Sequence, residues 1–276
     1  NKVLFPKDPI AEIERALEHP IGTPRLEDLV RPGQRVVIIS DDITRPTPVH
    51  RVLPLLLTRL NRAGVPDERI SVVMALGSHR PMTPAEMDKK LGEEIRRRVP
   101  VYNAEFRDRG GLVDLGLAPG GVRVWVDRRV AEAEVRIGIG SIVPHPATGW
   151  SGGGKIIYPG VTGEETVTAF HLMHGRTPYN MYGMDKSPVR EAMERWVDTV
   201  GLHFIVNLVC LPTGEIFHAV AGHYIQAHRA GVEWAKRLYA VKARGKVDIA
   251  IVSSYPADAD LWQAPKGVMA GEFLVR

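Results

Sequence analysis

Short runs of apolar, β-branched residues recur along this chain of 276 residues, with helical patterns between them. Five runs that are apolar at nearly every position are predicted to be strands: residues 35–40, 70–77, 135–140, 204–211 and 247–254. A strand that is apolar at consecutive positions is buried on both faces, which is typical of a parallel sheet covered by helices. The alternation predicts an α/β fold with a doubly wound, mainly parallel sheet.

Helix signals lie between the predicted strands. An i, i+3, i+4 stripe of valine and leucine precedes Gly64, and a glycine there is typical of a helix end. Thr83 with Glu86 three residues later forms a capping-box pattern at the start of another helix. Four helices are predicted, over residues 49–63, 82–98, 189–197 and 222–241.

A basic stretch at residues 242–246 is the best candidate for a domain boundary. We therefore expect residues 1–244 to form an N-terminal α/β domain that holds the catalytic and cofactor-binding residues. Residues 245–276 are expected to begin a C-terminal α/β domain of an incomplete chain, because the sequence starts without methionine and stops at GEFLVR.

Composition argues against several classes of protein. The net charge of +4 comes from scattered lysines and arginines, which fits anionic small molecules better than nucleic acid. The single Cys210 lies in an apolar run, which excludes a disulfide framework and indicates a buried thiol. No apolar run approaches the roughly 18 residues of a membrane span, and no basic-then-apolar leader is visible, so we expect a cytoplasmic protein without membrane contact.

Polar clusters follow the predicted strands at their carboxyl ends, where ligands bind in sheets of this kind. The clusters are DDITRPTP at residues 41–48, GSHRP at 77–81, PHP at 144–146 and the segment 258–266. Two acids and an arginine at a strand end exceed what a turn needs, although Asp, Thr and Pro are also ordinary turn residues. These clusters predict one ligand site at this edge of the sheet.

The segment around Lys155 is rich in glycine and histidine. Residues 149–155 fit the G-x-x-x-x-G-K half of a phosphate-binding loop, but Ile156 stands where a magnesium-binding hydroxyl is required. Pro159 also prevents the helix that such a loop must open. A lysine presented by a glycine loop remains, and the glycines at 152–154 allow the backbone to approach a ligand closely.

Three histidines flank this lysine. His145 lies between two prolines, which stiffen the backbone that presents its imidazole. His171 and His174 are three residues apart and share one helical face, a spacing that suits a pair of metal ligands and equally suits ordinary exposed histidines.

The order of the motifs DDITRPTP, GSHRP, PHPATGWSGGGK, YPGVTGEETVTAFH and LWQAPK resembles the lactate racemase family, over nearly the whole chain. The resemblance implies a racemase or epimerase of 2-hydroxy acids that carries a nickel-pincer nucleotide, a pyridinium-3-thioamide-5-thiocarboxylic acid mononucleotide with nickel. It further implies that the cofactor is attached to Lys155, that enzymes of cofactor synthesis are partners, and that nickel takes His171, sixteen residues further on, as its protein ligand.

The same resemblance implies roles for the remaining site residues. His79 and His145 would be the two catalytic bases, one for each face of the substrate. Two neutral imidazoles suit a reaction that removes the hydroxyl proton of a 2-hydroxy acid. The remaining residues that would line the cofactor and substrate site are Asp42, Arg45, Gly152, Gly153, Gly154, Trp262, Gln263 and Lys266.

The positive charges of Arg45 and Lys266 suit the substrate carboxylate and the developing carbonyl. Trp262 is bulky at a position where family members differ, which suggests a substrate other than lactate itself. Two alternatives stay open: a non-catalytic protein that binds the cofactor or nickel through Lys155 and His171, and a phosphotransferase that uses the glycine loop.

Overall fold

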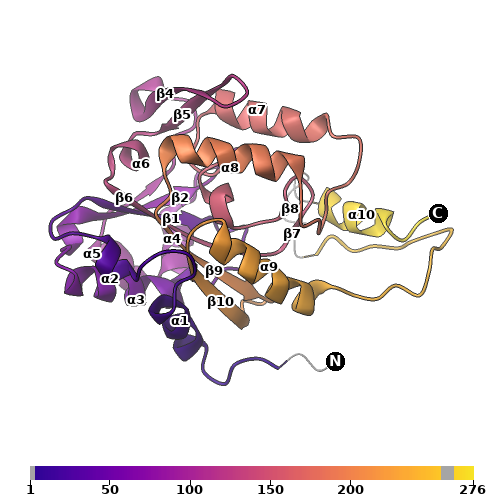
Figure 1. Cartoon of the computed structure of the whole chain (residues 1–276), viewed down its shortest axis with the longest axis horizontal. Coiled ribbons are helices and arrows are strands. Elements are labelled where there is room, and N and C mark those ends of the chain that lie inside the picture. The colour runs from indigo at the N-terminus through magenta and orange to yellow at the C-terminus, as the bar shows by residue number, and fades with distance from the viewer. Residues whose placement is uncertain (1–3, 256–263) are drawn as a thin grey trace.

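A computed structural model describes residues 4–255 and 264–276, and its centre is a six-stranded sheet with the strand order β10-β9-β6-β1-β2-β3 (Figure 1). The strands are β1 (Val36–Asp41), β2 (Ile70–Ala75), β3 (Val101–Asn103), β6 (Val135–Ser141), β9 (Phe204–Cys210) and β10 (Ile216–Gly222). All neighbouring pairs are parallel except β9 with β10. The predicted mainly parallel α/β fold is confirmed.

Successive residues of each central strand pack into two different hydrophobic cores. Val36 and Ile38 of β1 belong to one core, and Val37 and Ile39 belong to the other. The first core is closed by α1 (Pro9–Glu18), α2 (Leu26–Leu29), α3 (Val49–Arg62), α4 (Pro84–Leu91) and α5 (Glu93–Arg98). The second is closed mainly by α8 (Pro188–Val200) and α9 (Gln226–Tyr239). Burial on both faces explains the near-continuous apolar runs.

Helices form in all four regions where they were predicted, but their bounds differ from the prediction. Thr83 and Glu86 form the expected capping box, but the helix predicted over 82–98 is two helices, because Gly92 adopts a φ of 94° between them. The prediction of a helix from residue 222 was wrong at its start. Residues 216–222 form β10, which pairs with β9, and α9 begins only at Gln226.

The strand predicted at 247–254 was also wrong. Val247 makes one isolated bridge with Val275, and the side chains of Ile249 and Ile251 are 82% and 98% exposed. An apolar run becomes a strand only where a neighbour accepts its backbone hydrogen bonds, and the described residues provide none beyond that bridge. The domain boundary expected at residue 244 stays a prediction.

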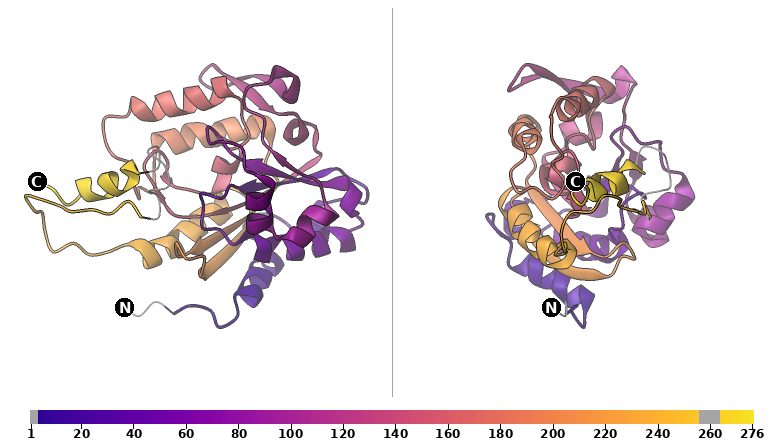
Figure 2. Two further views of the ribbon diagram at one scale, coloured as in Figure 1. Left: turned by 180° about the vertical axis from the view of Figure 1, so that it is seen from behind. Right: turned by 90° about the vertical axis from the view of Figure 1, so that its right-hand side faces the viewer.

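Smaller elements complete the fold (Figure 2). They are the hairpin of β4 (Leu112–Ala118) with β5 (Val122–Asp127), α6 (Arg128–Glu132), the hairpin of β7 (Pro144–His145) with β8 (Gly149–Trp150), α7 (Glu164–Gly175) and α10 (Pro265–Glu272). Asn180 fastens α10 to the body, since its Nδ2 donates to the carbonyl oxygen of Met269 at 2.7 Å. Within the described ranges, no helix has both the length and the apolar character to cross a bilayer.

Candidate active site

A cavity of about 400 Å³ opens at the carboxyl ends of β1, β2 and β6. The sheet order changes direction between β1 and β6, and this is where open α/β sheets bind ligands. The predicted site residues that line the cavity are Asp42, Arg45, His79, His145, Gly152, Lys155, His171 and Lys266. The described structure thus brings together side chains that are up to 224 residues apart in the sequence, from position 42 to position 266.

Asp42 holds His79 through a short hydrogen bond. Its Oδ2 lies 2.5 Å from Nδ1 of His79, and its Oδ1 accepts from the backbone amide and hydroxyl of Thr44. Burial raises the pKa of Asp42, but the hydrogen bond from His79, the charge of Arg45 and Thr44 outweigh it and bring the pKa to about 2. Asp42 is therefore ionised and accepts a proton-bearing Nδ1 from His79.

A buried ion pair supports the loop that carries Asp42 and Arg45. Nζ of Lys90 lies 2.8 Å from Oδ1 of Asp41 and donates to the carbonyl oxygen of Arg45 at 2.9 Å. The hydroxyl of Thr47 donates to the other oxygen of Asp41. Lys90 thereby connects α4 to the end of β1, and its removal would leave Asp41 buried without its cation.

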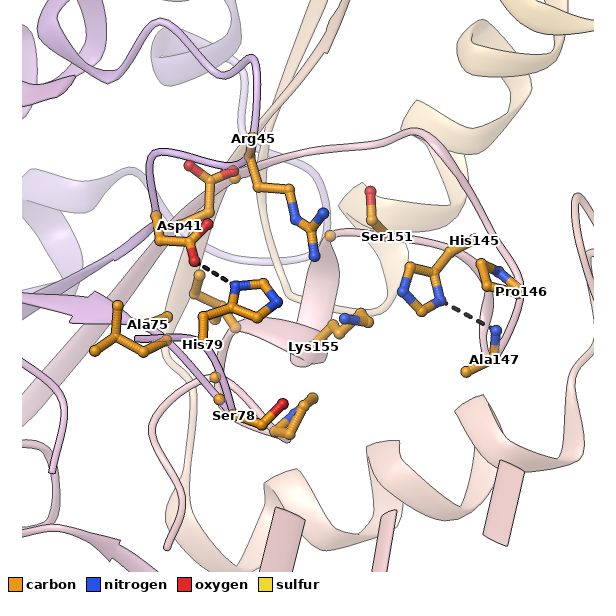
Figure 3. A pocket seen from close by; sticks show the side chains of 18 of the residues that line it. Asp41, Arg45, Ala75, Ser78, His79, His145, Pro146, Ala147, Ser151 and Lys155 are labelled. Atoms are coloured by element: carbon orange, nitrogen blue, oxygen red, sulfur yellow. Dashed lines mark hydrogen bonds and ion pairs between the residues drawn. The ribbon is translucent and has the colours of Figure 1, made fainter. Parts of the chain in front are cut away.

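His145 lies at the other side of the cavity, on the β7–β8 hairpin (Figure 3). Its Nδ1 accepts the backbone amide of Ala147 at 3.1 Å and lies 3.3 Å from the hydroxyl of Thr148. Burial lowers its pKa well below the usual value, and the positive charges of Lys155, Lys266, Arg45 and Arg190 act in the same direction. These surroundings favour the neutral imidazole of His145.

Lys155 projects into the cavity from a 3-10 turn at residues 153–156, between His79 and His145 (Figure 3). Burial lowers the pKa of its amine well below the usual value, helped by Arg45, Lys266 and Arg190 and opposed by Asp42. These surroundings favour the neutral amine, which is the nucleophilic form. They therefore favour the form of Lys155 that can be acylated.

The three glycines before Lys155 serve the packing of this turn. Gly152 lines the cavity and has a φ of 78°, and Gly153 has a φ of 60°. A Cβ on Gly153 would lie 2.9 Å from the carbonyl oxygen of Tyr224, and one on Gly154 would lie 2.8 Å from a methyl group of Val197. These two contacts point into the protein body, so a cofactor contact at Gly153 and Gly154 stays a prediction.

Arg190 of α8 holds the loop between His145 and Lys155 through hydrogen bonds. Its Nε donates to the carbonyl oxygen of Thr148 at 3.0 Å, and Nη2 donates to that of Trp150. The guanidinium is buried and pairs with Glu194 at 3.2 Å. A planar guanidinium suits several carbonyl oxygens in fixed directions, so Arg190 sets the spacing between the imidazole and the amine.

Helix α7 contributes two histidines to the cavity wall, His171 and His174. Burial lowers the pKa of His171 to about 4, and Lys155, His174 and His79 contribute. A metal ligand must be a neutral imidazole, and His171 meets that condition at neutral pH. Nδ1 of His174 is buried without a hydrogen-bond partner among the described residues. Within those residues, no group of three His, Cys, Asp or Glu side chains converges as a protein-only metal site.

Helix α10 carries Lys266 and Met269 to the cavity. The predicted substrate residues Trp262 and Gln263 lie outside the described residues. Three residues that support the site were not predicted from the sequence: Lys90, Arg190 and Asn207. Oδ1 of Asn207 accepts a hydrogen bond from the amide of Gly153 at 2.7 Å. The sequence did mark Asn207, because it is a polar residue inside the apolar run at 204–211. It did not mark Lys90 or Arg190, since each is one of many charged residues on a helix.

Comparison with known proteins shows that the chain is similar to two lactate racemases. The lactate racemase of Thermoanaerobacterium thermosaccharolyticum is 34% identical over 264 residues, and that of Lactiplantibacillus plantarum is 35% identical over 268 residues. Each match covers 94% of this chain and 62% of the relative. The chain therefore spans about three fifths of the length of these curated relatives.

The fold is also similar to that of a lactate racemase. It matches the lactate racemase apoprotein of Thermoanaerobacterium thermosaccharolyticum with a TM-score of 0.89 at 33% identity, over 97% of this chain and 64% of that chain. A Thermotoga maritima protein of known crystal structure gives a TM-score of 0.70 at 26% identity, over 87% of this chain and 61% of that one. Residues 1–182 match the model of the lactate racemase N-terminal domain, and the chain belongs to that family.

Proposed function

We propose that the protein is a racemase or epimerase of a 2-hydroxy acid that uses a nickel-pincer nucleotide tethered to Lys155. One observation carries the proposal: His79, His145, Lys155 and two cationic side chains, Arg45 and Lys266, line a single cavity at the point where the sheet order reverses. The likeness to two lactate racemases supports the same reaction class.

The residues present fit the proposed cofactor. The amine of Lys155 lies inside the cavity, and its lowered pKa favours the neutral form from which an amide or thioamide bond is made. His171 is neutral and can serve as one metal ligand. The soft sulfur ligands that suit nickel would come from the cofactor, so the chain would need to supply only an imidazole. The unpartnered Nδ1 of His174 leaves a polar atom at this wall for a ligand to satisfy.

When bound, the cofactor supplies a site that takes a hydride from the carbinol carbon and returns it. The chain supplies position and charge. Arg45 and Lys266 bind the substrate carboxylate, an interaction that a largely buried site strengthens. Nε2 of His79 takes the hydroxyl proton, and the carboxylate of Asp42 stabilises the imidazolium that forms. His145 faces the same space from the other side, and Trp262 and Gln263 complete the proposed substrate contacts.

A non-catalytic carrier of nickel or cofactor is the second candidate. The tight pairing of Asp42 with His79 favours catalysis over storage, because storage needs no oriented base. A phosphotransferase is less well supported, since Lys155 lies in a 3-10 turn and not at the start of an α-helix. We further propose a cytoplasmic location, cofactor-synthesis enzymes as partners, and no contact with nucleic acid or membrane.

The test is a racemisation assay on the protein produced together with cofactor-synthesis enzymes. Single enantiomers of lactate and of larger 2-hydroxy acids are incubated with the protein and separated by chiral chromatography. We expect interconversion of at least one acid, and its loss in His79→Ala. If the protein carries both nickel and the cofactor mass yet leaves every acid unchanged, the carrier function replaces the racemase.

A further inference from the structure

His228 of α9 contacts the backbone that leads to Lys155 without lining the cavity itself. The residue is completely buried, with an exposed fraction of 0%. Its Nε2 lies 2.8 Å from the carbonyl oxygen of Ser151, which precedes the glycine turn. The ring also packs against that turn, because a Cβ on Gly153 would lie 3.0 Å from Cγ of His228. A buried polar side chain therefore supports the turn from the side of α9.

Both ring nitrogens of His228 have partners. A carbonyl oxygen only accepts hydrogen bonds, so the contact with Ser151 requires a proton on Nε2. Nδ1 lies 2.9 Å from Nη1 of Arg229, and a guanidinium only donates, so Nδ1 keeps its lone pair. Burial lowers the pKa of His228 well below the usual value, and the charges of Arg190 and Arg229 act in the same direction. These surroundings favour one neutral tautomer, whose proton is directed at Ser151.

The backbone of the glycine turn is held by three different elements. The hydroxyl of Ser151 donates to the carbonyl oxygen of Ser141, at the end of β6, at 2.6 Å. The amide of Gly153 donates to Oδ1 of Asn207 on β9 at 2.7 Å. These two contacts fix the turn relative to the sheet, and the contact of His228 with Ser151 fixes it relative to α9.

Charged side chains hold the His228 ring in its orientation. Nη2 of Arg229 donates to Oε2 of Glu194 at 2.8 Å, and Oε1 of Glu194 pairs with Arg190 at 3.2 Å. Arg190 in turn holds the carbonyl oxygens of residues 148 and 150. The network contains two guanidiniums and one carboxylate, so a further positive charge on the ring is disfavoured. Helices α8 and α9 thus hold neighbouring parts of one loop through connected side chains.

We propose that His228 is a positioning residue for Lys155, which keeps the glycine turn where the amine enters the cavity by donating to the carbonyl oxygen of Ser151. The proposal rests on the proposed function, in which this amine carries the cofactor. His228 acts only through the backbone and transfers no proton. Without its N–H, the buried carbonyl of Ser151 loses this partner, and the turn relaxes toward water. The amine of Lys155 then lies less deeply in the cavity.

Two amide side chains separate the two contacts of the ring. Glutamine can place an N–H near the position of Nε2 and keep the hydrogen bond to Ser151. Asparagine is one methylene shorter, so it can place its oxygen near the position of Nδ1 and face Arg229, but it cannot reach Ser151. A third variant, His228→Leu, fills the space and makes neither contact. The control is His203→Asn, because Nδ1 of His203 accepts the amide of Arg136 near the other end of β6.

The first experiment uses the apoprotein and needs no cofactor. The protein is treated with a trace of acetic anhydride over a series of pH values, and peptide mapping gives the pH midpoint at which Lys155 becomes reactive. In the wild type, in His228→Gln and in His203→Asn, this midpoint should lie well below the usual lysine value of about 10.4. In His228→Asn and His228→Leu it should move up toward that value.

Urea unfolding shows which variants are folded, and His228→Leu gives the result if His228→Asn does not fold. A midpoint that stays at the wild-type value in the folded variants without the Ser151 contact would overturn the proposal. An equal rise in His228→Gln would also overturn it, because the hydrogen bond to Ser151 would then not be the cause.

The second experiment measures cofactor occupancy by intact mass, on protein produced together with cofactor-synthesis enzymes. His228→Asn should lower the occupancy of Lys155 by about fivefold, the scale of one lost hydrogen bond, and His228→Gln should restore it. Full occupancy in His228→Asn would show that the turn is held without His228 and would overturn the proposal. A wild type without the adduct would contradict the proposed function, while the reactivity of Lys155 in the apoprotein still decides the role of His228.

Discussion

The buried ammonium of Lys90 lies 2.8 Å from the carboxylate of Asp41, a residue that lines the cavity. Lys90 and Asp41 are 4% and 9% exposed, so bulk water solvates both side chains little. The pair joins α4 to the strand end from which Asp42 and Arg45 project. A buried ion pair adds little to the free energy of unfolding by itself, but removal of one partner leaves the other charge buried and unpaired.

We therefore predict that Lys90→Met destabilises the protein by about 3–5 kcal/mol, because Asp41 is left buried without a cation. Urea unfolding measures the change. The double variant with Asp41→Asn should recover much of the loss, since no unpaired charge remains. The exposed neighbour Lys89 gives the control, and Lys89→Met should change stability by less than about 0.5 kcal/mol. A small effect of Lys90→Met would show that the ion pair does not support the loop.

The Asp42–His79 contact predicts a pH dependence. The pKa of Asp42 is about 2 in the folded protein, below the value of about 3.9 expected when unfolded. Its contribution to stability is therefore present above that unfolded value and disappears as the pH falls through about 2. Asp42→Asn should lower the free energy of unfolding by on the order of 2 kcal/mol at pH 6.

The deficit of Asp42→Asn should then shrink between pH 4 and pH 2, as the wild type loses the same interaction. Urea unfolding at a series of pH values measures it, and Asp28→Asn on the surface is the control. A deficit that stays constant from pH 6 to pH 2 would mean that Asp42 is not ionised against His79.

Four strands and the site they support were predictable from the sequence. Strands β1, β2, β6 and β9 are buried on both faces, and that burial alone produces the near-continuous apolar runs. Parallel strands bring their carboxyl ends to one edge, so the polar clusters after β1, β2 and β6 had to meet. The convergence of Asp42, His79 and His145 follows from topology.

Other features depended on contacts that no local pattern contains. The run at 247–254 has the composition of a strand, but only Val247 finds a bridge partner among the described residues. Strand β10 was not predicted, because its pattern is short and adjoins α9 closely, and only its last residue, Gly222, fell within the predicted helix. Arg190 reaches carbonyl oxygens some forty residues away, at Thr148 and Trp150, and such long-range contacts leave no periodic signature.

Under the proposed function, the two histidines of α7 should differ. His171→Ala should lose nickel while the organic part of the cofactor stays on Lys155, because the family resemblance makes this imidazole the protein ligand. His174→Ala should keep nickel and serves as the matched control, one helical turn away on the same wall. Metal analysis and intact mass on the same samples measure both quantities. Loss of nickel in His174→Ala alone would exchange the two assignments.

Under the proposed function, Lys155 carries the cofactor. Intact mass with peptide mapping measures this on protein produced together with cofactor-synthesis enzymes. We expect a mass adduct on the peptide that contains Lys155 in the wild type and in Lys186→Ala, an exposed control lysine just before α8. We expect no adduct in Lys155→Ala. An adduct that persists at full occupancy in Lys155→Ala would contradict the account.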